Sequence, residues 1–126
     1  MKSMRSVSTP SPDWARPVVH WEIEARDPDR LRAFYQALFN WNIGDGPIMN
    51  IAPGIGAPEM GLAGHIRGGE HSRVNLYVQV RDVADSLERA QQLGGRVTIE
   101  PFDVPGGPRL AGIADPENNP LMLVQQ

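Results

Sequence analysis

A histidine and a glutamate occupy alternate positions near the start of the chain, at His20 and Glu22. A histidine beside a carboxylate suits general acid–base chemistry, because the negative charge raises the imidazole pKa toward neutral pH. On a β-strand these two side chains point to the same face. We therefore interpret His20 and Glu22 as candidate catalytic residues. The alternative is that they form a hydrogen-bonded floor or a dimer seam.

A second group of residues is suited to holding a ligand rather than to chemistry. Asn75 and Tyr77 carry an amide and a phenol, which hydrogen-bond a ligand, and the tyrosine ring also stacks on one. Met49 and Met122 are flexible apolar side chains that fill irregular gaps and accept ligands of varied shape. We predict these four as ligand-binding residues, with ordinary core packing as the alternative for the methionines.

The segment that carries His20 and Glu22 has the pattern of a strand followed by a helix. Over 18–25, apolar and polar residues alternate, which predicts a strand with Val19, Trp21 and Ile23 on one face. Asp27 is a good N-cap, and the proline after it suits the first helical position. A helix is predicted to Phe39, and its apolar stripe is formed by Leu31, Phe34, Tyr35 and Leu38.

The same unit occurs again over 75–93. His20 corresponds to Asn75 and Glu22 to Tyr77, and the helix cap Asp27 corresponds to Asp82. A repeated unit of this length indicates a domain made of two similar halves. After the second helix, Gly94 suits the left-handed position that ends many helices.

The rest of the chain is predicted to form short strands separated by turns. We expect strands at 47–52, 59–66, 96–102, 109–114 and 120–125, with a glycine- and proline-rich loop at 53–58. A polar linker at 67–71 then separates halves at about 17–66 and 72–126 within one domain, 17–126. Residues 1–16 are predicted to be a flexible arm, with Trp14 as a possible anchor.

Composition excludes several classes of function. The chain has 126 residues and a formal net charge of −3, so no basic field attracts nucleic acid or an anionic membrane. It contains no cysteine, which rules out thiol catalysis and thiolate metal sites. No apolar run approaches the roughly 20 residues of a membrane helix, and the first residues lack an apolar signal core. We expect a cytoplasmic protein.

The chain resembles the vicinal oxygen chelate superfamily, which contains glyoxalases, bleomycin-resistance proteins and extradiol dioxygenases. The resemblance rests on 20–35 (HWEIEARDPDRLRAFY), Gly94-Gly95 and the turn 115–119 (DPENN). It is strongest to small glyoxalase-like proteins of bacteria. It implies an α+β fold of two βαβββ modules that form a curved sheet cleft with the helices outside. It also implies a homodimer.

The resemblance further implies where a metal would bind. Metal-using relatives place ligands on the first and fourth strands of each module, and the first-strand position falls on His20. The matching positions of the second module fall on Asn75 and Met122, which suit such an ion poorly. The remaining ligand position falls on Glu59 or His65. We therefore expect no metal cofactor; a divalent metal, if held, would use His20 with Glu22, Glu59 or His65.

These features favour a glyoxalase-like protein that binds a small, partly apolar molecule in its cleft without a complete metal site. One alternative is a metal-dependent lyase, isomerase or dioxygenase that uses His20. Another is a drug-sequestering protein like the bleomycin-resistance proteins, although its 6% aromatic content equips the chain weakly for that role.

Overall fold

The computed structural model of the chain describes residues 15–52 and 62–125. Its elements in chain order are β2 (Val18–Ala25), α1 (Pro28–Phe39), β3 (Ile48–Ile51), β4 (Gly64–Gly68), β5 (Arg73–Val80), α2 (Val83–Gln92), β6 (Arg96–Asp103), β7 (Arg109–Ala114) and β8 (Pro120–Gln125). No helix among these is long and apolar enough to cross a membrane. The predicted loop 53–58, Trp14 and Glu59 lie outside the described residues. So does the predicted arm, except for its last two residues.

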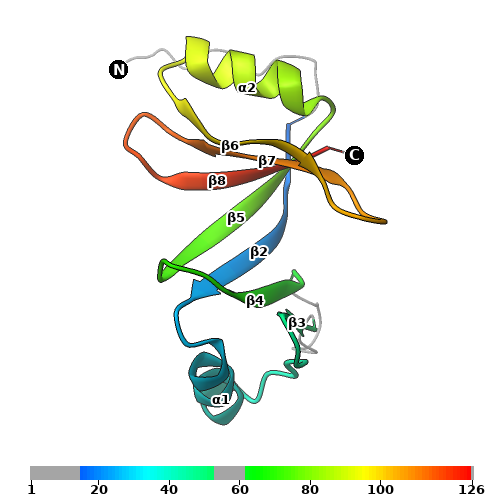
Figure 1. Cartoon of the computed structure of the whole chain (residues 1–126), viewed down its shortest axis with the longest axis vertical. Coiled ribbons are helices and arrows are strands. Elements are labelled where there is room, and N and C mark those ends of the chain that lie inside the picture. Colours follow the sequence, from blue (N-terminus) through cyan, green and yellow to red (C-terminus); the bar gives the residue numbers. More distant parts are fainter. Residues whose placement is uncertain (1–14, 53–61, 126) are drawn as a thin grey trace.

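The strands form one seven-stranded sheet in the order β3-β4-β2-β5-β8-β7-β6. The two halves of the chain meet at its centre, where β2 and β5 pair antiparallel. On either side, β4 runs parallel to β2 and β8 runs parallel to β5. This arrangement repeats one pattern in both halves. The helices α1 and α2 lie at opposite ends of the molecule, outside the sheet (Figure 1).

Local sequence explains where both helices begin and end. The side chain of Asp27 accepts a hydrogen bond from the backbone N–H of Arg30 at 3.2 Å, and Asp82 accepts one from Asp85 at 3.1 Å. These contacts confirm the two predicted N-caps. After the helices, Asn40 (φ 56°) and Gly94 (φ 98°) take left-handed backbone conformations, as predicted for Gly94.

Each half has its own core beneath its helix. Ile23, Ile51 and Ile66 are buried with Met49 in the first core, against which Tyr35 and other partly buried residues pack. Met49 is therefore a core residue and not part of the ligand-binding wall predicted for it, because alternation along β3 turns it away from the cavity. The second core lies under α2 and contains Val80, Val83, Leu87, Ala111 and Leu123.

Three details differ from the predicted elements. The strand β4 continues to Gly68, so it includes the start of the predicted linker. A β-bulge between Val18 and His20 shifts the pairing with β5, and Val19 packs near Tyr77 rather than with the first core. In α1, Phe34 and Leu38 are 54% and 59% exposed, so the predicted apolar stripe is only partly buried.

Gly64 is a point where a side chain does not fit. It pairs with Trp21 across β2 and β4, and a Cβ at Gly64 would overlap the indole ring. We predict that Gly64→Ala lowers the free energy of unfolding by about 1–3 kcal/mol, because overpacking displaces the ring. Gly68→Ala is the matched control in the same strand, since its Cβ would lie 3.6 Å from Pro28 Cγ, an ordinary contact. Equal urea-denaturation midpoints for the two variants would contradict this packing.

Candidate functional site

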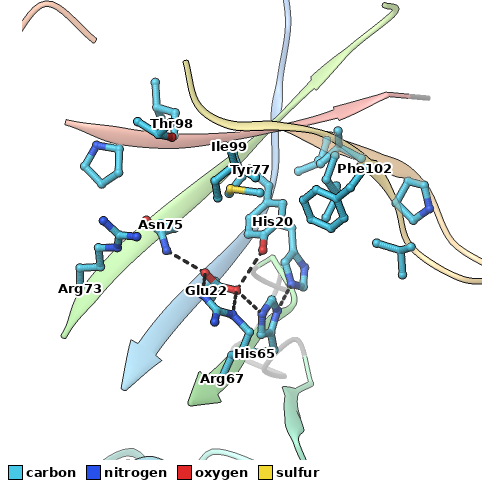
Figure 2. Close-up of a pocket in the computed structure, with 18 of the residues that line it drawn as sticks. His20, Glu22, His65, Arg67, Arg73, Asn75, Tyr77, Thr98, Ile99 and Phe102 are labelled. Atoms are coloured by element: carbon cyan, nitrogen blue, oxygen red, sulfur yellow. Dashed lines mark hydrogen bonds and ion pairs between the residues drawn. The ribbon is translucent and has the colours of Figure 1, made fainter. Parts of the chain in front are cut away.

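A cavity of about 950 Å³ opens on the concave face of the sheet. Polar side chains of β2, β4 and β5 form one part of its lining, and they include His20, Glu22, His65, Asn75 and Tyr77. Apolar side chains of β6, β7 and β8 form much of the rest. Figure 2 shows the polar groups converging on Glu22. The volume is within the range of ordinary small-molecule sites.

Glu22 is the centre of the polar network. Glu22 is 2% exposed, and four side chains donate hydrogen bonds to its carboxylate (Figure 2). The donors are His65 Nε2 at 2.7 Å, Asn75 Nδ2 at 2.7 Å, Arg67 Nε at 2.9 Å and Tyr77 Oη at 3.0 Å. The strands β4 and β5 flank β2 and supply these donors, so the sheet itself positions them.

This environment keeps Glu22 ionised. Burial alone raises the pKa of the Glu22 carboxyl, but the hydrogen bonds from His65, Arg67 and Asn75 outweigh burial and hold the pKa below its ordinary range. The pKa of Tyr77 is raised, first by burial and then by the charge of Glu22. Tyr77 therefore stays protonated and donates its O–H to the carboxylate.

The two candidate catalytic residues do not contact each other in the way the sequence suggested. His65 lies between them: its Nδ1 is 2.7 Å from His20 Nε2, and its Nε2 is bonded to Glu22. The expected rise in the pKa of His20 is wrong. Burial and the neighbouring His65 lower this pKa, and the more distant charge of Glu22 offsets only part of the effect.

The hydrogen bonds determine where the protons sit when both imidazoles are neutral. Glu22 accepts only, so His65 carries its proton on Nε2 and its Nδ1 is an acceptor. His20 must then donate from Nε2, which leaves its Nδ1 with a free lone pair. When His20 takes a proton at Nδ1, it can pass its Nε2 proton to Nδ1 of His65. The positive charge then lies beside Glu22.

The structure also places the other predicted residues and reveals ones that were missed. Tyr77 and Met122 are paired on β5 and β8 and both line the cavity, as does Asn75. Sequence reasoning missed Arg67 and Arg73, which line the same cavity. The sequence pattern places Arg67 in a linker, and Arg73 stands alone at the start of its strand. Neither residue therefore gives a local signal of its buried carboxylate partner, Glu22 for Arg67 and Glu24 for Arg73.

Comparison with known proteins agrees with this architecture. The family model described as a glyoxalase-like domain matches residues 20–124. The chain belongs to this family. Its similarity to the anthracycline biosynthesis protein DnrV of Streptomyces peucetius is 36% identity over 85 residues. The match covers 68% of this chain and 27% of the relative, so the chain spans about a quarter of that protein's length.

Solved structures share the glyoxalase-like fold at low sequence identity. A glyoxalase/bleomycin resistance protein/dioxygenase superfamily member from Vibrio splendidus 12B01 has a TM-score of 0.62 and 14% identity, covering 89% of this chain and 100% of that one. Methylmalonyl-CoA epimerase from Mycobacterium tuberculosis has a TM-score of 0.56 and 15% identity, with 86% of each chain covered. These similarities establish the fold alone.

The donor set of this glyoxalase-like domain can be tested against the metal that the resemblance implies. Glu22 pairs with His65 in the first half as Tyr77 pairs with Met122 in the second. His65 is therefore the equivalent of Met122, and it rather than Glu59 occupies the remaining ligand position. The four positions thus hold two imidazoles, the amide of Asn75 and a thioether.

These four groups do not fit a divalent metal. Two imidazole nitrogens on one zinc ion stand about 3.3 Å apart, whereas those of His20 and His65 share a proton at 2.7 Å. The second nitrogen of His65 is bonded to Glu22, whose oxygens already accept four donors. Within 15–52 and 62–125, no group of three His, Asp or Glu side chains is arranged to hold a metal.

The network predicts a pH-dependent contribution of Glu22 to stability. The pKa of Glu22 is lower in the folded than in the unfolded chain. The stabilisation is therefore complete above about pH 5 and is lost progressively as the pH falls below the unfolded value of 4.5. We predict that Glu22→Gln lowers the free energy of unfolding by about 2–4 kcal/mol at pH 7. The difference from wild type should shrink between pH 5 and pH 3 in chemical denaturation.

Glu117→Gln is the matched control for this charge change, because Glu117 lies exposed in the turn before β8. Its unfolding free energy should follow that of wild type at every pH. A Glu22→Gln variant that is as stable as wild type at pH 7 would contradict the central position of the carboxylate.

Proposed function

We propose that the protein binds a small, partly apolar molecule in the cavity on the concave face and does so without a metal ion. The observation that carries this proposal is the cavity itself, where a hydrogen-bonded polar group around Glu22 adjoins an apolar wall. Such a combination orients a ligand through its polar atoms and gains affinity from its apolar surface. Similarity to a protein of anthracycline biosynthesis agrees with a partly apolar ligand.

Metal-free binding is supported by the chemistry of the donors. The hydrogen bond from His20 occupies the Nδ1 lone pair of His65, the other His65 nitrogen is bonded to Glu22, and Asn75 and Met122 offer no carboxylate. These points argue against the metal-dependent lyase, isomerase or dioxygenase. Drug sequestration differs from our proposal mainly in the ligand, and the same binding measurements address it. The homodimer and the cytoplasmic location stay predictions.

A ligand screen tests the proposal directly. We predict that small aromatic and aliphatic organic acids raise the melting temperature of the purified protein, because a ligand that binds only the folded state stabilises it by mass action. The shift should be the same in excess EDTA and after addition of Zn²⁺, Mn²⁺ or Ni²⁺. A shift that requires one of these ions would contradict metal-free binding.

Two tryptophan variants serve as controls for the location of binding. Ile99 lines the cavity and is 39% exposed, so Ile99→Trp should narrow the cavity and reduce the ligand-induced shift. Leu93 lies after α2, away from the cavity lining, and Leu93→Trp should leave the shift unchanged. A full shift retained in Ile99→Trp would place binding elsewhere.

A second candidate function is proton transfer by His20. The hydrogen-bonded series His20–His65–Glu22 favours it, because the free Nδ1 of His20 can take a proton while the charge is shared with His65. In this reaction an acidic C–H bond of the ligand breaks, its proton goes to Nδ1, and the electron pair enters an adjacent carbonyl as an enolate.

Hydrogen exchange tests this second function. We predict that the protein accelerates exchange of the benzylic C–H of phenylpyruvate into D₂O, followed by NMR, at least 100-fold over buffer. His20→Ala should abolish the acceleration. His71→Ala is the control, since His71 is an exposed histidine that contacts Glu24 outside the cavity lining. Equal exchange with wild type and His20→Ala would rule out His20 as the base.

A further inference from the structure

The cavity carries a charge opposite to that of the whole protein. The chain has a formal net charge of −3, yet its cavity lining contains three arginines, Arg67, Arg73 and Arg96, and only one carboxylate, that of Glu22. An acidic protein that gathers guanidinium groups around one hollow has a local positive field there. The question is which of these arginines have donors left for a ligand.

Contacts within the protein engage all three nitrogens of Arg67. Its Nε bonds Glu22 at 2.9 Å, its Nη1 donates to the carbonyl of Gly68 at 3.1 Å, and its Nη2 lies 3.4 Å from both Glu22 and Glu24. Arg73 differs. Its Nε donates to the buried Glu24 at 2.9 Å, which anchors the side chain but leaves the terminal Nη groups without a hydrogen bond to any described residue.

Arg96 supplies the second set of available donors. One of its Nη atoms contacts Asn118, and no carboxylate is paired with it among the described residues. Arg96 is paired with Ala114 across β6 and β7, and Ala114 is paired with Pro120 on β8. On the parallel strands β8 and β5, Leu121 is paired with Leu76, so the preceding residues Pro120 and Asn75 lie level with each other. Asn75 is two residues from Arg73 along β5. Arg73 and Arg96 therefore belong to the same end of the cavity.

The opposite end of the cavity is apolar. Phe102 is paired with Leu110, and Leu110 with Val124, which gives a second row across β6, β7 and β8. Val104 and Pro108 add to the lining there. In Figure 2, Arg73, Asn75 and Thr98 lie toward one side of the cavity and Phe102 toward the other, with His20 and Tyr77 between them. The cavity thus changes from cationic to apolar along its length.

We infer that the ligand is an amphipathic organic anion, with a carboxylate on an apolar body. The carboxylate lies at the Arg73 and Arg96 end, since a guanidinium fork matches a carboxylate and binds it through two parallel hydrogen bonds. The apolar body lies against Phe102 and Leu110, and its middle passes His20 and Tyr77. This inference rests on the proposed function, because it names the class of ligand for the same cavity.

A pair of probes that differ only in charge tests the inference. Isothermal titration calorimetry of the full chain should show that 2-naphthoate binds at least tenfold more tightly than the neutral 2-naphthamide. Arg73→Gln and Arg96→Gln should each weaken 2-naphthoate about tenfold and leave 2-naphthamide unchanged. Phe102→Ala should weaken both probes by the same factor, because it removes apolar contact alone.

Arg89→Gln is the matched control, since it removes one positive charge from α2 outside the cavity lining and should alter neither affinity. Arg96→Gln keeps the test decisive even if Arg73→Gln unfolds, because Arg96 has no buried carboxylate partner among the described residues. Equal binding of the two probes would overturn the anionic ligand while the proposed binding function stands. Binding of neither probe at millimolar concentration would overturn both.

Discussion

Burial of one ionised carboxylate constrains the centre of this protein. An ionised carboxylate is costly to remove from water unless hydrogen bonds and opposite charge compensate it. Glu22 is compensated by donors from two flanking strands, among them His65 and Arg67 on β4 and Tyr77 on β5. The pairing of β2 with both neighbours must therefore keep its register, because a shift by one residue would turn these donors away.

The same interaction determines the chemistry of the cavity. Because Glu22 engages one nitrogen of His65, the other nitrogen is left to accept a hydrogen bond from His20. Arg67 is also held by Glu22, whereas Arg73 and Arg96 are the cavity arginines with terminal nitrogens not bonded to a described residue. A fold shared with the glyoxalase-like family thus carries a site whose properties follow from its own side chains.

Much of the architecture could be predicted from local patterns. The alternation over 18–25 and the caps Asp27 and Asp82 gave the strand and both helix starts, because these features depend on residues close together in the sequence. The internal repeat gave the two similar halves, and their first strands meet at the centre of the sheet. Of the candidate site, His20, Glu22, Asn75, Tyr77 and Met122 all line the cavity.

The sequence by itself determined the elements, the repeat and which strand faces are polar, since periodicity and capping act over a few residues. Only the tertiary structure decided which polar groups meet. His65 reaches Glu22 from another strand, Met49 lies in a core instead of the cavity, and the bulge beside His20 moves Val19 toward Tyr77. Such contacts join residues far apart in the chain, and strand register and curvature set them rather than any local preference.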